Sequence, residues 1–259
     1  MDESSQKKTD GEIVAPSDLA PVLEWLDGEV PRSTSFDDTY FSRDGGLSET
    51  RHVFLAGNGL PERWAGRETF TIAEFGFGTG LNFLATLAAL KEIAEPPNLT
   101  YVSFELHPMT RDQLARAHSV FPELAVEVSD LIGQWDPQPG WSKFSVQGVQ
   151  LWLGIGDARD LISDVAERRE GLEEGFLPGR PTEIDAWYLD GFSPSKNPAL
   201  WEAGLLSKAH KLTAEGGTFA TYTSAGWVRR NLEAAGFSLE KRKGFGGKRE
   251  MVVGWKAGS

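Results

Sequence analysis

The segment FTIAEFGFGTGLNFLATLAALK, residues 70–91, decides the fold, because its pattern changes from that of a strand to that of a helix across a run of glycines. Residues 70–75 are mostly apolar and aromatic, which is typical of an interior strand. Residues 80–91 are rich in leucine and alanine and predict a helix. A second apolar run, residues 99–105, follows. Together the three runs predict a right-handed βαβ unit.

The same alternation of strand and helix patterns continues to the end of the chain. We predict helices at residues 110–120, 158–168, 199–212 and 225–235, and strands at 144–146, 149–155, 184–189, 218–222, 237–242 and 250–255. The last two strands should form an antiparallel pair. This order is typical of an α/β fold with a doubly wound sheet covered by helices on both faces. We expect a mobile tail at residues 1–20, an extension packed on the core at 21–68 and the main domain at 69–259.

Charge is distributed unevenly along the 259 residues. Residues 226–259 hold eight Lys or Arg against three acidic residues, a net charge of +5, so the remainder carries −17. Such asymmetry is typical of a nucleic-acid contact on an acidic body, although a solvated basic face gives the same pattern.

Several classes of protein are disfavoured by composition. The chain has no cysteine, which excludes thiolate metal sites and a cysteine nucleophile, and its four histidines lack paired ligand spacing, so we expect no metal. It has no apolar run long enough to span a membrane and no signal-peptide pattern at its start. We therefore expect a soluble cytoplasmic protein.

The glycine run predicts a ligand site where the first strand meets the first helix. Glycines there let a ligand approach the backbone closely, although such a turn can also be only a tight connection. Glu105 ends the next strand, where an acid can bind ribose hydroxyls. The dinucleotide motif would need Gly or Ala at Leu81, whereas the third glycine is Gly80. An acid followed by G-x-G-x-G resembles the first motif of S-adenosylmethionine-dependent methyltransferases. The predicted cofactor residues of this segment are Glu74, Gly76, Phe77, Gly78, Gly80 and Asn82.

Two further acids follow predicted strands. Asp157 could accept the exocyclic amine of an adenine, as in similar methyltransferases, or it could cap the next helix; both roles can coexist. Asp190 lies in the loop of IDAWYLDGFSPSKNP, residues 184–198, and is either a functional acid or a turn residue, since Asp-Gly is a common turn pair. In such methyltransferases this loop faces the transferred methyl group. Phe192, Pro194, Lys196 and Asn197 would then border the acceptor.

The basic residues near the C-terminus are interleaved with an aromatic ring and several glycines. Lys243, Phe245 and Lys248 in KRKGFGGKRE, residues 241–250, suit phosphate contacts and base stacking, so we predict that they contact a nucleic-acid substrate. A solvated hairpin is the alternative interpretation, and a loop that closes over the cofactor is another.

Taken together, these motifs resemble the methyltransferase domain of the MnmC family, bacterial bifunctional enzymes of tRNA wobble-uridine modification, and the similar stand-alone MnmD type. The resemblance rests on segments 36–60, 74–83, 103–108, 185–201, 216–237 and 241–251, and leaves residues 121–182 outside apart from Gly156 and Asp157. It implies a class I fold that uses S-adenosyl-L-methionine to methylate the 5-aminomethyl group of (2-thio)uridine at the wobble position of tRNA.

The resemblance also implies roles and partners. It places Asp190 at the reaction centre, where a carboxylate would orient the acceptor amine, and it places Glu105 and Asp157 around the cofactor. The chain lacks a flavin-type dinucleotide motif, so we expect no oxidase activity in it, and an FAD-dependent oxidase that acts earlier in the pathway is a candidate partner. The alternatives are a methyltransferase for another amine, in a small molecule or a protein, and a non-catalytic nucleotide-binding module.

Overall fold

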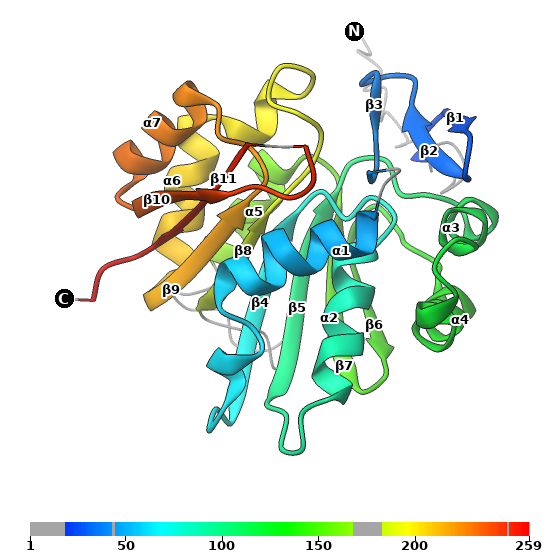
Figure 1. Ribbon diagram of the computed structural model, residues 1–259, viewed down its shortest axis with the longest axis horizontal. Helices are drawn as coiled ribbons and strands as arrows, with labels where there is room; N and C mark the ends of the chain where they lie inside the picture. The colour runs from blue at the N-terminus through cyan, green and yellow to red at the C-terminus, as the bar shows by residue number, and fades with distance from the viewer. Residues whose placement is uncertain (1–18, 43–44, 168–182, 248, 259) are drawn as a thin grey trace, which may run out of the picture.

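An eight-stranded sheet forms the centre of the computed structural model, which describes residues 19–42, 45–167, 183–247 and 249–258 (Figure 1). The strand order is β10-β11-β9-β8-β4-β5-β7-β6. The strands are β4 (Thr69–Phe75), β5 (Asn98–Glu105), β6 (Gly140–Val146), β7 (Val149–Ile155), β8 (Ile184–Leu189), β9 (Thr213–Thr221), β10 (Ser238–Lys243) and β11 (Glu250–Trp255). The predicted tail, residues 1–20, lies outside the described residues except for its last two.

The centre of the sheet is parallel and its two edges are antiparallel. Strand β4 pairs in parallel with β5 on one side and with β8 on the other. The chain therefore winds first from β4 toward β7 and then returns to build β8 and β9, which makes the β4–β8 boundary the topological switch point. The last two strands, β10 and β11, pair antiparallel. The predicted doubly wound α/β fold is confirmed.

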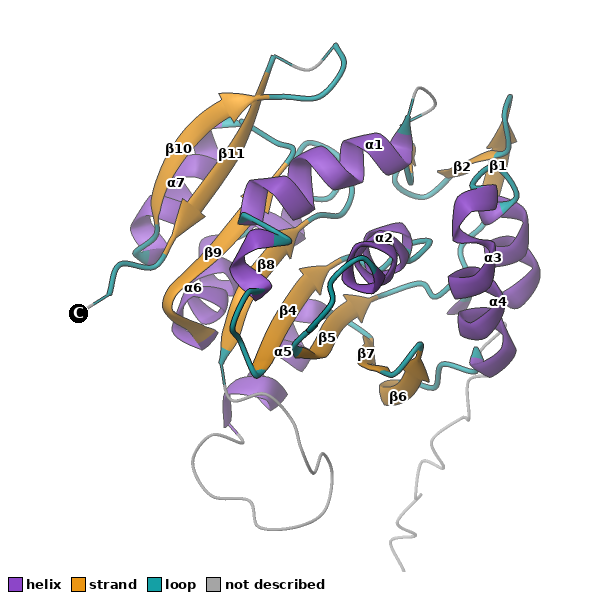
Figure 2. Cartoon of the chain, turned by 60° about the horizontal axis from the view of Figure 1, so that its bottom comes forward, coloured by secondary structure: helices purple, strands orange, loops and turns teal. Residues whose placement is uncertain are grey.

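Helices cover both faces of the sheet (Figure 2). One face carries α1 (Gly46–Thr50), α2 (Leu81–Lys91) and α4 (Ala125–Gln134), with α3 (Arg111–His118) packed beside α4. The other face carries α5 (Ala158–Glu167), α6 (Ala203–Leu212) and α7 (Gly226–Ala235).

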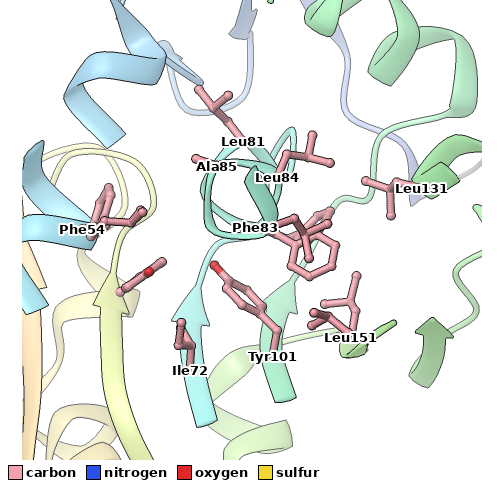
Figure 3. Packing of buried hydrophobic residues seen from close by; sticks show 14 of the residues in the cluster. Phe54, Ile72, Leu81, Phe83, Leu84, Ala85, Tyr101, Leu131 and Leu151 are labelled. Carbon is pink, nitrogen blue, oxygen red and sulfur yellow. The ribbon is translucent and has the colours of Figure 1, made fainter. Parts of the chain in front are cut away.

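Helix α2 is buried on nearly all sides in its first two turns. Residues 81–87 are all buried, because the helix lies between the sheet and α1, η2 (Arg51–Leu55) and α4. In Figure 3 Phe83 and Leu84 of α2 belong to one cluster with Leu131 of α4 and Ile72 of β4, and the ring of Phe83 lies 5.0 Å from that of Tyr101 on β5. A helix in such a place needs apolar residues all round rather than one apolar stripe, which explains the leucine- and alanine-rich sequence. Each fully buried Leu or Phe stabilises the fold by roughly 1.5–3 kcal/mol.

The N-terminal extension joins a small sheet to one helical face. Strands β1 (Leu23–Leu26), β2 (Val30–Ser33) and β3 (Asp38–Thr39) form an antiparallel sheet, and short helical turns follow α1. These turns are η2, η3 (Ala56–Asn58) and η4 (Glu62–Trp64). The ring of Phe54 lies 5.4 Å from that of Tyr188 on β8, so the turns after α1 pack directly on the main sheet.

Several elements of the structure differ from the prediction. Helix α4 was not predicted, although Leu124, Val128, Leu131 and Ile132 recur at helical spacing and pack into or against the core. The helix predicted at 199–212 is split into η6 (Pro198–Trp201) and α6 by the extended residue Glu202. Strand β9 starts at Thr213 instead of residue 218, because Gly216 and Gly217 lie in an irregular stretch of the strand, where the register against β8 shifts, rather than in a turn.

Candidate functional site

A cavity of about 430 Å³ lies at the carboxyl ends of the central strands, around the switch point between β4 and β8. Its volume is in the range of small-molecule sites. It is lined by parts of the loops after β4, β5, β7 and β8, by residues of the extension and by Tyr222. Nine of the predicted residues line it, namely Gly76, Phe77, Gly78, Asn82, Glu105, Asp157, Asp190, Phe192 and Asn197.

The glycine loop brings two chain segments into close contact. A Cβ at Gly76 would lie 3.0 Å from Cα of Gly191, so the loops after β4 and β8 touch through their backbones. Gly80 is the left-handed N-cap of α2 and is not part of the cavity wall. Phe77 reaches the cavity, but its ring is 3% exposed and stacks on Trp135, which makes it mainly a core residue.

Glu105 fixes the glycine loop to the loop after β5. Its Oε2 accepts a hydrogen bond from the backbone N–H of Gly78 at 2.8 Å, and its Oε1 accepts one from His107 at 2.7 Å. Burial raises the pKa of this carboxyl, and the two backbone donors oppose that effect. Each oxygen keeps a further lone pair, so the carboxylate can still accept hydroxyl donors from a ligand.

Asp157 caps α5 as well as facing the cavity. Its Oδ1 accepts the backbone N–H of Arg159 at 2.8 Å, and its Oδ2 lies 2.6 Å from the Arg159 guanidinium. These contacts lower the pKa of Asp157. The capping interpretation is therefore confirmed, and the predicted contact with an adenine amine stays a prediction.

Asp190 is held at the cavity by the amide of Asn82. Asn82 Nδ2 donates to Asp190 Oδ2 at 2.7 Å and to Glu74 Oε1 at 2.8 Å. Glu74 is fully buried behind the amide and does not line the cavity, and Ser103 Oγ donates to its Oε2 at 2.8 Å. Burial, followed by the charge of Asp190, raises the pKa of Glu74. The structure thus places Glu74 behind the cavity wall, whereas the motif predicted a direct cofactor contact.

The loop after β8 is fastened to the N-terminal extension. The ring of Phe192 stacks on Phe36 at 4.8 Å, and Ser193 N donates to Asp38 Oδ2 at 2.9 Å. Lys196 forms an ion pair with Asp37 and, like the buried Pro194, is not part of the cavity wall. Two of the four residues predicted to border the acceptor, Phe192 and Asn197, therefore do line the cavity.

The sequence interpretation missed the part of the wall that the extension supplies. Asp38, Tyr40, Glu49, Thr50 and Phe54 all line the cavity. The acidic and aromatic run at residues 36–41 was the available signal, but nothing in it identifies which strand ends it will cover.

Tyr222 was missed as well. It follows β9, lines the cavity and donates its hydroxyl to the backbone oxygen of Gly191 at 2.9 Å. The hydroxyl thereby fixes the residue next to Asp190. Burial, followed by the charge of Asp190, raises the pKa of Tyr222, so its phenol stays protonated.

Comparison with known proteins identifies the family. A family model described as S-adenosyl-L-methionine-dependent methyltransferase matches residues 122–257, just over half of the chain. The chain belongs to this family. The match also includes residues 122–182, which the motif resemblance had wrongly left outside apart from Gly156 and Asp157.

Curated relatives agree with the resemblance to MnmC. The chain is 44% identical over 244 residues to a protein of Aeromonas hydrophila and 46% identical over 238 residues to one of Aromatoleum aromaticum. Both are named tRNA 5-methylaminomethyl-2-thiouridine biosynthesis bifunctional protein MnmC. The matches cover 91% and 90% of this chain but 35% of each relative, so the chain spans about a third of their length.

A solved structure named MNMC2 from Aquifex aeolicus has the same fold. It superimposes with a TM-score of 0.66 at 21% identity, over 95% of this chain and 73% of the other. The predicted class I methyltransferase fold is therefore confirmed.

The cavity of this methyltransferase suits S-adenosyl-L-methionine. A Cβ at Gly76 or Gly78 would lie 3.0 Å from Gly191 or Tyr40, so glycines at these positions let the loop pack closely against both neighbours at the edge of the cavity. The described cavity wall contains acidic residues but no Lys or Arg. Such a wall favours a sulfonium cation and disfavours a pyrophosphate. Among the described residues, no group of His, Asp and Glu could hold a metal ion, and no helix is long and apolar enough to cross a membrane.

The basic hairpin of β10 and β11 lies outside the cavity wall. Phe245 packs against Gly45 and its ring lies 5.9 Å from that of His52 beside α1, and the backbone oxygen of Lys243 accepts a hydrogen bond from His52 Nε2. Two basic side chains of the hairpin are ion-paired, Lys241 with Glu250 and Arg242 with Glu240. Lys248 lies outside the described residues.

Proposed function

We propose that this methyltransferase transfers a methyl group to the primary amine of 5-aminomethyl-(2-thio)uridine at the wobble position of tRNA, giving 5-methylaminomethyl-(2-thio)uridine. The observation that carries this proposal is the position of Asp190. Its carboxylate is held just after the carboxyl end of β8 by Asn82, and it lines a cavity whose described residues include no Lys or Arg. The name of the curated relatives supports the choice of tRNA.

The chemistry needs a neutral amine held in line with the methyl donor. An alkylamine with a pKa of about 10 reaches the cavity as an ammonium ion, so it must lose a proton before its lone pair can attack. When bound, S-adenosyl-L-methionine supplies an electrophilic methyl carbon on a sulfonium sulfur. Asp190 accepts a hydrogen bond from the ammonium and orients the nitrogen, and the proton passes to the carboxylate or to solvent. The nitrogen forms the new C–N bond as the C–S bond breaks.

The other predicted residues have supporting roles in this proposal. Glu105 accepts the ribose hydroxyls, and Asp157 accepts the adenine amine of the cofactor while it caps α5. Phe192 and Asn197 border the acceptor base. Lys243 and Phe245, on the hairpin beside the extension, contact the tRNA outside the cavity. An FAD-dependent oxidase that acts earlier in the same pathway is the partner that we expect.

The test is transfer of a labelled methyl group to tRNA taken from a strain that lacks the modification. We expect label in the wobble uridine of that tRNA and none in tRNA that already carries the methylaminomethyl group. Titration calorimetry with S-adenosyl-L-methionine should show binding. Binding without transfer to any tRNA would favour a non-catalytic module, and transfer to a small amine or a protein instead would favour another methyltransferase activity.

A further inference from the structure

The amide of Asn82 connects two carboxyl groups that lie at different depths. One carboxyl, that of Asp190, lines the cavity, and the other, that of Glu74, is fully buried. The amide nitrogen lies 2.7 Å from Asp190 Oδ2 and 2.8 Å from Glu74 Oε1, and Asn82 itself is 6% exposed. Its two N–H donors are thus both committed to carboxyl groups.

The other end of the same amide is committed as well. Thr50 Oγ1, at the end of α1, donates to Asn82 Oδ1 at 2.9 Å, and Thr50 is also buried. Rotating the amide by half a turn would place its oxygen against two carboxyl oxygens and its nitrogen against the Thr50 hydroxyl. Only one orientation satisfies all the partners, so the amide is a rigid donor toward Asp190.

The groups around Asp190 are mostly acidic or phenolic, so a hydrogen bond from Asn82 affects whether Asp190 is charged. Besides Glu74 on β4, Tyr101 on β5 and Tyr222 after β9 interact electrostatically with Asp190, while Asp38 and Glu49 line the same cavity. The acids disfavour a charged Asp190, whereas a hydrogen bond donated to the carboxylate favours it. Asn82 is a donor to Asp190 that opposes the neighbouring acids.

We propose that Asn82 is a positioning residue, which holds Asp190 ionised and oriented toward the acceptor amine, and that Thr50 sets the orientation of Asn82. This inference rests on the proposed function only for the identity of the acceptor. It assigns to the N-terminal extension, through Thr50, a part in preparing the catalytic carboxylate. It also gives Asn82 a role different from the cofactor contact that the glycine motif predicted.

The experiment compares Asn82→Ala and Thr50→Val with Thr86→Val as the matched control. Thr86 is a buried threonine one turn along α2, and its hydroxyl bonds to the backbone oxygen of Asn82 and meets Tyr188, not Asp190. For each variant we would measure kcat and KM for the tRNA, the Kd for S-adenosyl-L-methionine and the thermal unfolding midpoint. Carbon NMR of aspartate-labelled protein gives the titration midpoint of Asp190, whose signal is assigned by its loss in Asp190→Asn.

For Asn82→Ala we expect kcat to fall by about 10- to 100-fold, the range for a lost hydrogen bond to a charged group. The Asp190 midpoint should move to higher pH while the cofactor Kd stays unchanged. Thr50→Val should also lower kcat and raise the Asp190 midpoint, but by less. If Asn82→Ala does not fold, the Thr50→Val result tests the inference instead. Thr86→Val should change neither kcat nor the Asp190 midpoint.

An unchanged Asp190 midpoint in a folded Asn82 or Thr50 variant would overturn the inference. So would a weaker cofactor Kd with normal kcat, because that result would make Asn82 a cofactor contact. If the wild-type protein methylates no tRNA, the proposed function fails, but the NMR titration still decides the role of Asn82.

Discussion

The ring of Tyr40 lies directly against the backbone of Gly78: a Cβ added at Gly78 would be 3.0 Å from Tyr40 Cδ1. Gly78 also donates its N–H to Glu105, so the glycine loop lies between the ring of Tyr40 and the carboxylate of Glu105 and contacts both. Burial, followed by the charge of Glu105, raises the pKa of Tyr40 and keeps the phenol neutral beside that carboxylate. The extension thereby covers the part of the cavity beside the glycine loop and Glu105.

Gly78→Ala should weaken cofactor binding. Gly78 has φ +57°, a left-handed conformation that costs a residue with a Cβ roughly 1–2 kcal/mol, and the new methyl group would displace Tyr40. We expect the Kd for S-adenosyl-L-methionine to rise by about tenfold or more, measured by titration calorimetry. Gly133→Ala, on exposed α4 with open space around it, is the control and should bind normally. Equal affinity in both variants would show that the loop does not contact the cofactor.

Asp190→Asn should abolish methyl transfer while cofactor binding persists. The substitution keeps the size of the side chain but removes the charge that orients the ammonium and can accept its proton. We expect kcat to fall by roughly 100-fold or more, the scale of a lost acid-base group, in the tRNA transfer assay. Asp185→Asn, on strand β8 just before the Asp190 loop, is a matched control, because Asp185 binds Arg67 and the backbone N–H of Thr71. Normal turnover in Asp190→Asn would remove Asp190 from the reaction centre.

Most of the sheet could be predicted because each parallel strand is a short apolar run followed by a helix pattern. The position of Glu74 could have been predicted too. Side chains alternate along a strand, so Glu74 shares a face with Ile72, which packs beneath α2. The glycine motif predicted that Glu74 contacts a ligand, whereas the alternation of side chains along the strand predicts that Glu74 is buried beneath α2.

The wall that the extension supplies could not be predicted from local patterns. Thr50 and Asn82 are 32 positions apart, and Asp38 and Ser193 are 155 apart, so only the packing of the whole chain brings them together. The net charge of residues 226–259 does not show which of its basic side chains are paired, for a similar reason. In the structure Lys241 pairs with Glu250 on the neighbouring strand, and Arg242 pairs with Glu240 on its own strand.

Neutralising Lys243 should weaken tRNA binding more than neutralising Lys241. Both side chains are exposed on β10 two residues apart, but Lys241 lies 2.8 Å from Glu250, so less of its charge is available to a phosphate. We expect Lys243→Gln to raise KM for the tRNA and to make the salt dependence of binding shallower by about one phosphate contact. Lys241→Gln is the matched control and should have the smaller effect. Equal effects would indicate that the tRNA breaks the ion pair or does not reach the hairpin.

His118 should make the protein less stable in mild acid. Its Nε2 donates to the backbone oxygen of Thr79 in the glycine loop at 2.7 Å, and its Nδ1 has no hydrogen-bond partner among the described residues. Burial lowers the pKa of His118 to about 4, whereas an unfolded histidine titrates near 6.5. Between these values the unfolded chain binds the extra proton, so the free energy of unfolding falls as the pH falls through this window.

Replacing His118 allows its contribution to the pH dependence of stability to be measured directly. From pH 7 to pH 5 the His118 contribution should fall by about 2 kcal/mol, which urea unfolding of the wild type and of His118→Asn at both pH values can resolve. Because buried Glu74 and Glu105 titrate in the opposite sense, only the difference between the two proteins isolates the histidine. If His118→Asn loses as much stability in acid as the wild type, another group causes the loss and the His118 ring is not the buried neutral donor to Thr79.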